Sequence, residues 1–385
     1  MIQLDNKQNC CGCYACENVC PKSCIKMELD QEGFRYPVVN PDLCISCGLC
    51  EQVCPIANRK EKKIEEGYPI AVACKNIDEN TRKRSSSGGI FPLLAERVLQ
   101  KGGSVFGAVY DSNFTVLHTM INEESQIAAM QGSKYVQSRI EHSYREAKKL
   151  LDRDKPVLFS GTPCQINGLY CFLGRDYEKL YTVDIVCHGV PSEKVWKNYL
   201  AFLEKKYKSR ILNVNFRNKE YGWKNYFLHI DFENGRTYKQ VYYYDAYMRG
   251  YLKNIFLRPS CHVCRYKGFS YKSNLTLADY WGVWKECPEM YDDKGTSLVI
   301  VKNEKGRKLL DLAIDVVQEK QVSLEAAIAH NPSIIRATEQ SEKREQFFSD
   351  IERKNIQRCL MSASEISEIQ LCKAKIKQLL KKRMG

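Results

Sequence analysis

Eight cysteines near the amino terminus fall into two copies of one spacing. Cys10-x-x-Cys13-x-x-Cys16-x-x-x-Cys20-Pro21 is followed by Cys44-x-x-Cys47-x-x-Cys50-x-x-x-Cys54-Pro55. Three thiolates at this spacing reach three irons of one 4Fe–4S cluster, and in proteins with two such runs the fourth cysteine binds the other cluster. The sequence therefore predicts two clusters, one on Cys10, Cys13, Cys16 and Cys54 and the other on Cys44, Cys47, Cys50 and Cys20.

Zinc sites and disulfide frameworks are the alternatives, because both also use closely spaced cysteines. Neither needs a third cysteine at the next i+3 step or a Cys-Pro beyond it, and this chain has both features twice. Gly12 and Gly48 fit the tight turns in which a side chain would crowd a cluster. Cys11 and Cys24 fall outside the spacing and are interpreted as packing thiols.

More cysteines recur at predicted turns later in the chain: Gly161-Thr162-Pro163-Cys164-Gln165, Cys187-His188-Gly189 and Cys261-His262-Val263-Cys264. A Cys-x-x-Cys pair alone fits a redox pair or half of a zinc site equally well. Four thiols at the ends of neighbouring strands can nevertheless meet. We predict a third 4Fe–4S cluster on Cys164, Cys187, Cys261 and Cys264, with Cys287 as the reserve ligand. Buried structural thiols are expected for Cys74, Cys171, Cys359 and Cys372.

Two polar segments are candidates for a flavin site. Clusters transfer single electrons, so reduction of an organic molecule needs a two-electron converter, usually a flavin. The loop Ser85-Ser86-Ser87-Gly88-Gly89, at a predicted helix start, offers hydroxyls, backbone N–H groups and a positive dipole end to a pyrophosphate. Its alternative is an ordinary turn or cap. The segment Gln131 to Ser138 adds Ser133, Lys134 and Tyr135 to the candidate flavin site. The alternative interpretation of this segment is an exposed helix-to-strand connection.

The elements that must position these residues indicate a mixed α/β protein. Buried apolar runs predict strands over 70–74, 103–109, 156–160 and 181–186, and helical spacing predicts a helix over 90–99. The expected fold class is α+β or α/β, with a two-cluster ferredoxin fold followed by a mixed α/β flavin-binding body and a helical tail. The expected divisions are a dicluster domain over 1–57, a charged linker over 58–67, the body in two parts over 68–150 and 151–330, and a helical basic tail over 331–385.

Composition and charge narrow the class of protein. The chain has 385 residues, 44% of them hydrophobic and 27% charged, and a formal charge of +13. No secretory signal and no apolar run long enough for a membrane span are visible, so we expect a cytoplasmic protein without a membrane span. Much of the positive excess lies in the linker and the tail and no nucleic-acid motif accompanies it, which disfavours nucleic-acid binding. Acidic ferredoxins or anionic substrates are the expected partners of this charge.

Taken together, the motifs resemble the coenzyme F420 hydrogenase/dehydrogenase beta-subunit family in the form fused to an N-terminal dicluster ferredoxin. The resemblance rests on the cysteine repeat and on the segments 85–89, 132–138, 161–165, 187–192, 258–264 and 275–282. It implies FAD in the central domain, a third 4Fe–4S cluster nearby and hydride exchange at the flavin, with coenzyme F420 or an anabolic metabolite as the substrate. Ala278 stands where we would expect glycine.

The leading hypothesis is an FAD- and ferredoxin-type oxidoreductase. Lys134 would hold negative charge near the reduced flavin or the substrate, and His188 could donate a proton, with a turn-stabilising role as its alternative. The second hypothesis is a non-enzymatic electron-relay subunit that feeds a separate catalytic partner. The expected partners are a ferredoxin or other redox protein and a small-molecule hydride acceptor. The sequence leaves the oligomeric state open, a homo-oligomer included.

Overall fold

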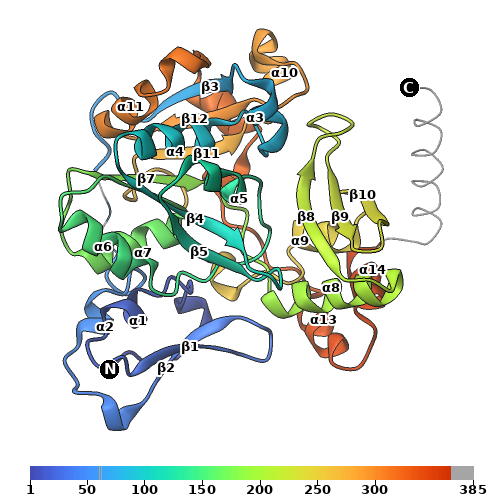
Figure 1. Cartoon of the computed structure of the whole chain (residues 1–385). Coiled ribbons are helices and arrows are strands. Elements are labelled where there is room, and N and C mark those ends of the chain that lie inside the picture. Colours follow the sequence, from blue (N-terminus) through green and yellow to red (C-terminus); the bar gives the residue numbers. More distant parts are fainter. Residues whose placement is uncertain (60, 62, 366–385) are drawn as a thin grey trace, which may run out of the picture.

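The computed structural model describes residues 1–59, 61 and 63–365. It has three parts, which Figure 1 shows as an N-terminal module below, a body built on one large sheet, and a lateral unit with a smaller sheet to the right. The basic end of the expected tail, residues 366–385 with Cys372, lies outside the described residues, and so do two residues of the expected linker.

The N-terminal module contains one antiparallel hairpin and two short helices: α1 (Ala15–Val19), β1 (Ile25–Leu29), β2 (Arg35–Val39) and α2 (Leu49–Gln52). The cysteine repeat is also a repeat of the backbone. Gly12 and Tyr14 flank Cys13 with φ of +67° and +66°, and Ser46 and Gly48 flank Cys47 with φ of +51° and +73°. A left-handed conformation is uncommon for Tyr14, so the turn around each central cysteine is imposed by the fold.

The body is organised around an eight-stranded sheet of order β13-β3-β12-β11-β7-β6-β4-β5. The four strands β11, β7, β6 and β4 are parallel to one another, and antiparallel strands flank them on both sides. The strands are β3 (Ile70–Asn76), β4 (Ser104–Tyr110), β5 (Val116–Ile121), β6 (Val157–Gly161), β7 (Leu180–Ile185), β11 (Leu275–Asp279), β12 (Ser297–Val301) and β13 (Val317–Val322).

Helices cover both faces of this sheet, which explains why its central strands are mostly apolar. In β6, Leu158 packs into the core with α4, and its neighbours Val157 and Phe159 pack into the core on the other face with α6 and α7. The helices of the body are α3 (Glu79–Arg84), α4 (Ile90–Gln100), α5 (Ile127–Met130), α6 (Ser143–Leu151), α7 (Pro163–Leu173), α10 (Val283–Glu286), α11 (Glu304–Asp311) and α12 (Leu324–Ala329).

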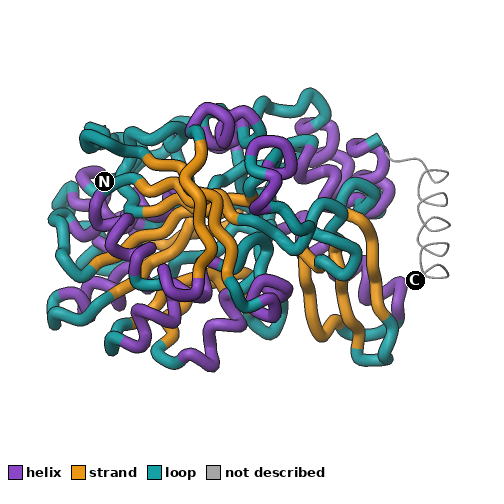
Figure 2. The backbone as a smooth tube through the Cα atoms, turned by 90° about the horizontal axis from the view of Figure 1, so that it is seen from above, coloured by secondary structure: helices purple, strands orange, loops and turns teal. Residues whose placement is uncertain are grey.

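The lateral unit has a core of its own. Its elements are α8 (Glu193–Tyr207), β8 (Ile211–Asn218), β9 (Phe227–Phe232), β10 (Thr237–Val241), α9 (Ala246–Leu252), α13 (Arg344–Ile351) and α14 (Ile356–Ser364). Trp196, Phe216 and Tyr247 pack together at its centre. Figure 2 shows its three strands standing beside the fan of the large sheet rather than continuing it.

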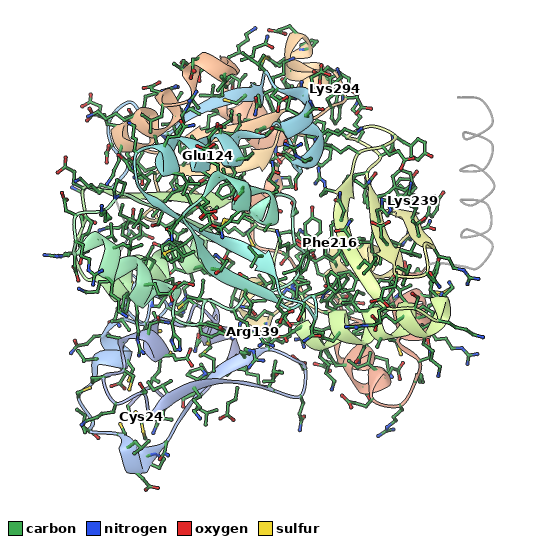
Figure 3. All side chains as sticks on the ribbon, viewed as in Figure 1. Cys24, Glu124, Arg139, Phe216, Lys239 and Lys294 are labelled. Atoms are coloured by element: carbon green, nitrogen blue, oxygen red, sulfur yellow. The ribbon has the colours of Figure 1, made fainter. Side chains whose placement is uncertain are left out.

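One buried carboxylate joins the three parts. Glu193 of α8 forms an ion pair with Arg139 of the body, and Arg35 of the N-terminal module stands 3.6 Å from the same carboxylate. Figure 3 labels Arg139 at this meeting point. The ion pairs hold the module and the lateral unit against the same edge of the body.

The strands and the helix expected from the sequence are confirmed within two residues as β3, β4, β6, β7 and α4. The three-stranded sheet of the lateral unit was not predicted. Single-turn 3₁₀ helices occur at Lys7–Asn9, Pro41–Leu43, Glu124–Gln126, Pro259–Cys261, Pro288–Met290, Ile314–Val316 and Pro332–Ile334. Among the described residues, no helix combines the length and the apolar character needed to cross a membrane.

Candidate functional site

The structure brings together each set of cysteines predicted in the N-terminal module. The first set lines one cavity, together with Cys11: Cys10, Cys13, Cys16 and Cys54. The second set lines another, together with Cys24: Cys20, Cys44, Cys47 and Cys50. Each cavity therefore receives three cysteines from one run and the fourth from the other. Cys47 is exposed, so the second set lies on the outer side of the module.

The third predicted set also meets in one place. Cys164, Cys187, Cys261 and Cys264 line a small cavity beside the large sheet. The Val190 N–H donates to the Cys261 sulfur at 3.3 Å, and the Thr162 hydroxyl lies 3.2 Å from the Cys164 sulfur. Cys164 belongs to the first turn of α7, where a turn was expected.

The cysteine held in reserve lies elsewhere. Cys287 packs in an apolar core with Tyr280 and Met290 and does not line the cavity of the third set. The reserve role is therefore not supported, because the cavity already receives four cysteines without it.

The cysteine sets fit clusters better than single ions. Among the residues that the structure describes, no three His, Cys, Asp or Glu side chains converge closely enough for one metal ion. Each thiolate of a 4Fe–4S cluster binds a different iron, so its ligands stand around a cavity rather than a point. Burial raises the pKa of the Cys187 thiol to about 12, and a thiol in such a place ionises only against positive charge such as bound iron.

A fifth thiol lies between the first and the third set. Cys11 lines both cavities, and its thiol lies beside those of Cys13 and Cys164. Gly168 of α7 faces Cys13 so closely that an added Cβ would stand 2.8 Å from the Cys13 Cβ. The first and third sets are thus separated by little more than one side chain, and Cys11 packs between them, buried as expected.

A larger cavity, of about 300 Å³, adjoins the third set at the carboxyl ends of the parallel strands, where open α/β sheets bind ligands. The volume is at the lower end of the range of about 300–1,000 Å³ for ligand pockets. Most residues predicted for the flavin and for catalysis line it: Ser85, Ser86, Ser87, Gly89, Ser133, Lys134, Tyr135 and His188. Gly88 does not. Its N–H donates to the Ser297 hydroxyl, and its backbone packs on the Cys74 carbonyl.

The two predicted polar segments, residues 85–89 and 131–138, form hydrogen bonds with each other in the wall of this cavity. The hydroxyls of Ser86 and Ser133 lie 2.8 Å apart, and the Ser133 N–H donates to the Ser86 oxygen at 2.7 Å. Ser85 ends α3, and its hydroxyl donates to the Thr81 carbonyl. Gly89 starts α4 with φ of +79°, so the positive end of an eleven-residue helix faces the same loop.

Lys134 supplies a cation to the cavity wall. Its Nζ donates to the carbonyls of Gln131 and Gly132, both at 3.3 Å, and stands 5.5 Å from the centre of the Tyr110 ring. Burial lowers its pKa to about 8. The side chain also lines an open cleft between the body and β8, so it separates the cavity from a second solvent-facing surface.

Two histidines in the wall have unpartnered nitrogens among the described residues. His118 Nε2 lies 2.8 Å from the Ser160 carbonyl, and its Nδ1 has no partner. His188 Nε2 likewise has none. Burial lowers the pKa of both imidazoles, that of His118 to about 4, so both are neutral at pH 7. Buried polar atoms without partners fit a cavity that takes a polar ligand.

A buried ion pair closes the cavity toward the lateral unit. Arg217 of β8 donates to both carboxylate oxygens of Asp279 at 2.7 and 2.9 Å, and to the Ser86 carbonyl at 3.2 Å. The Trp223 indole N–H donates to the same carboxylate at 2.9 Å. We did not predict Arg217, because it is distant in sequence from every motif. Asp279 was inside a quoted segment, and its place at a strand end was the available signal.

Comparisons with known proteins match two regions of the chain to protein families. Residues 9–58 match the 4Fe–4S dicluster domain, and residues 154–327 match the family described as the C terminus of the coenzyme F420 hydrogenase/dehydrogenase beta subunit. A solved structure, the F420-reducing [NiFe] hydrogenase complex from Methanosarcina barkeri, is similar at 17% identity and a TM-score of 0.47, over 72% of this chain and 91% of the other. No curated protein matches the chain.

The dicluster domain and the cysteine sets define an iron–sulfur protein of the oxidoreductase class. The chain therefore combines a 4Fe–4S dicluster domain over residues 9–58 with the C-terminal region of the coenzyme F420 hydrogenase/dehydrogenase beta-subunit family over residues 154–327.

Proposed function

We propose that this chain is an iron–sulfur flavoprotein oxidoreductase with two clusters in the N-terminal module, a third on the cysteines of the body, and FAD in the large cavity. When bound, the clusters supply one-electron transfer and the flavin exchanges hydride with a small organic molecule. Coenzyme F420 or an anabolic metabolite is the proposed hydride donor or acceptor. One observation carries the proposal: Cys187 and His188 line both the third-set cavity and the large cavity.

The roles of the chain's own residues follow from their positions. The Ser85–Ser87 hydroxyls and the start of α4 are suited to a pyrophosphate. Lys134 places positive charge where an anionic group would bind. His188 is neutral and packs edge-on against Tyr251, so it shields the third-set cavity from water and can hold a proton at Nε2.

The outer side of the second cysteine set is the proposed entry for electrons from a redox protein such as a ferredoxin. Cys47 is exposed there, and the apolar side chains of Leu43 and Ile45 beside it are 53% and 56% exposed. A small exposed apolar patch around a redox group is suited to transient docking.

The test is anaerobic reconstitution of the full chain with iron and sulfide, followed by iron analysis and titration with FAD. We expect about twelve iron atoms, four for each of three clusters, and FAD binding seen as a change in flavin absorption. Cys261→Ser should remove about a third of the iron and leave the N-terminal signals intact. A chain that binds no FAD would refute the flavin part of the proposal.

A cavity-filling variant sharpens this test. Ser133→Tyr places a ring in the wall of the large cavity and should abolish FAD binding without loss of iron. Ser125→Tyr, at an exposed turn, is the matched control and should bind FAD normally. Turnover of a hydride donor by the single chain with an artificial acceptor would then separate an enzyme from an electron-relay subunit.

A further inference from the structure

Arg258 is a fully buried cation at the junction between the N-terminal module and the body, with 0% exposure. Its guanidinium donates to four acceptors: the Cys10 carbonyl at 2.7 Å, the Cys10 sulfur at 3.4 Å, the Arg35 carbonyl at 2.9 Å and the Gln137 side-chain oxygen at 3.1 Å. Among the described residues, no carboxylate forms an ion pair with it.

The other deeply buried arginines are different. Arg82 is paired with Asp292, Arg217 with Asp279 and Arg344 with Glu32, in each case through two guanidinium nitrogens. A buried charge without a partner of opposite sign is strongly destabilising. The buried guanidinium of Arg258 therefore needs a nearby negative charge, and no carboxylate among the described residues provides it.

The first cysteine set would provide that charge. Four thiolates around a 4Fe–4S core give a net negative group, and Cys10, a member of the first set, already accepts a hydrogen bond from Arg258 at its sulfur. Gly12 makes this approach possible, because an added Cβ would lie 2.8 Å from Arg258 Nη1 and 2.7 Å from Gln137 Nε2. Gly12 therefore allows the close approach of Arg258 as well as the left-handed turn.

The second set has no matching buried cation among the described residues. The Ile2 N–H donates to the Cys50 sulfur at 3.3 Å, and Cys47 is exposed to water. Arg145 contacts this part of the module, but its partly exposed guanidinium donates to the backbone carbonyls of Asn18 and Cys20 at a helix end. Arg265, near the first set, is solvent-exposed, so its charge is screened.

We propose that Arg258 is a positioning residue for electron flow: it raises the reduction potential of the first N-terminal cluster above that of the second. A buried positive charge and a hydrogen bond to a ligand sulfur both favour the form with the extra electron. One electron then leaves the reduced second cluster, which is oxidised, and enters the first, which is reduced, with no proton or ligand exchanged. The inference rests on the two N-terminal clusters of the proposed function and is independent of the flavin and of the substrate.

The experiment is potentiometry of the reconstituted full chain, followed by electron paramagnetic resonance. The variant Cys47→Ser changes a cysteine of the second set. The N-terminal signal that it alters therefore belongs to the second cluster, and the other belongs to the first. In Arg258→Met the first cluster should become harder to reduce, so that the ratio of reduced first to reduced second cluster falls at least tenfold, about 59 mV for a one-electron couple. The second cluster serves as the internal reference and should not change.

Arg344→Met is the matched control. Arg344 also spans the junction and donates to the Leu257 carbonyl next to Arg258, but Glu32 neutralises its charge. This variant should leave the ratio of the two reduced clusters within twofold of the wild type. An equal change in both variants would mean that the junction, and not the charge of Arg258, sets the potentials.

If the Arg258→Met chain does not assemble its clusters, Gln137→Glu provides a second test of the proposal. The new carboxylate can accept the bond from Arg258 Nη1 and neutralises the cation in place, while the bond from Gln137 Nε2 to the Cys11 carbonyl is lost. We expect the first cluster to become harder to reduce, and Gln137→Leu, which loses both bonds without adding charge, to change less. An unchanged ratio in Gln137→Glu would overturn the proposal. A wild-type chain that binds both N-terminal clusters but no FAD would refute the flavin and leave this inference standing.

Discussion

Among the described residues, the buried arginines differ from two half-buried lysines, Lys134 and Lys219, in what surrounds their charge. The arginines pair with carboxylates, Arg258 excepted, whereas Lys134 and Lys219 are surrounded by backbone carbonyls. Carbonyl oxygens compensate a buried charge less completely than a carboxylate does, and burial lowers the pKa of Lys134 to about 8 and that of Lys219 to about 7. Both lysines therefore change their charge close to neutral pH.

The titration of Lys134 predicts a pH dependence of ligand binding. Below pH 8 the side chain is charged and attracts an anionic ligand, and above pH 8 it is neutral. The affinity for FAD should therefore fall between pH 7 and pH 9 by roughly tenfold, since a hydrogen bond to a charged group contributes about 1.5 kcal/mol. Fluorescence titration of FAD at each pH measures this.

Two variants isolate the contribution of Lys134. Lys134→Met should bind FAD more weakly at pH 7 and show little change up to pH 9. Lys219→Met is the control, because Lys219 contacts the Ser87 carbonyl from outside the cavity and its loss should change the affinity for FAD little at either pH. Parallel pH curves for wild type and Lys134→Met would contradict the prediction.

The close contact between Gly168 and Cys13 gives a second prediction at the scale of one residue. It lies inside α7, where alanine is favoured over glycine by about 1 kcal/mol on helix propensity alone. The added methyl group would stand 3.0 Å from the Cys13 sulfur, so we expect Gly168→Ala to lose about 1–3 kcal/mol through overpacking. Thermal unfolding and iron content measure the loss. A variant more stable than wild type with full iron content would show that the contact is loose.

The sequence predicts well which cysteines the fold brings together. The four members of the third set lie in three separate segments, and their turns after apolar runs were enough to group them. The position of Cys11 between the two cavities could not be predicted, because Cys164 is distant in the chain. Arg258 was visible inside a motif, but only the structure shows that its guanidinium has no carboxylate partner among the described residues.

At the scale of elements, the start of α7 connects two parts of the site. Gln165 accepts hydrogen bonds from the Thr162 N–H and hydroxyl at 3.0 and 3.1 Å, and its amide donates to the Ser138 hydroxyl and carbonyl at 2.9 and 3.2 Å. One side chain therefore fixes both the helix that carries Cys164 and the segment that carries Lys134.

Gln165→Ala tests this connection. The variant removes the partner of the half-buried Thr162 N–H and of the buried Ser138 hydroxyl, so the free energy of unfolding should fall by about 1–3 kcal/mol. Gln100→Ala, on the exposed end of α4, should change it by less than about 0.5 kcal/mol. Denaturant unfolding of the unloaded chain gives both values. Equal effects in the two variants would mean that the Gln165 bonds contribute nothing.

The elements that the sequence predicts best are those buried on both faces. β6 and β7 are rich in apolar residues because helices cover both sides of the large sheet. The strands β8–β10 were missed because polar residues interrupt them and their pairing depends on residues distant in sequence. The ion pair of Arg217 with Asp279 arises only after that second sheet has formed, so it could not be foreseen.

At the scale of the whole molecule, the three cysteine sets form a series that runs from the outer side of the N-terminal module into the body. The second set is on the outer side of the module, the first set lies against α7, and the third set lies beside the large cavity of the body. Figure 1 shows the module on one side of the body and the lateral unit on another, so the outer face of the module is free of both. Electrons from a partner would enter at this face.

Charge at this face should control the encounter with an acidic donor, since the chain has a formal charge of +13. Lys22 is exposed and lines the cavity of the second set. Lys22→Glu should slow reduction of the clusters by an acidic ferredoxin several-fold at low ionic strength. The difference should shrink as the Debye length falls from about 30 Å at 0.01 M salt to about 10 Å at 0.1 M. Stopped-flow absorption over this range measures the rates.

Lys205→Glu is the matched control, because it changes the net charge equally at an exposed position on α8 in the lateral unit. If docking occurs at the second set, Lys22→Glu slows reduction far more than Lys205→Glu does. Equal rates in the two variants would mean that the donor responds only to the overall charge, and electron entry would then have to be sought at another face. Reduction by dithionite, a small donor that needs no docking surface, should differ little between them and confirms that the clusters are intact.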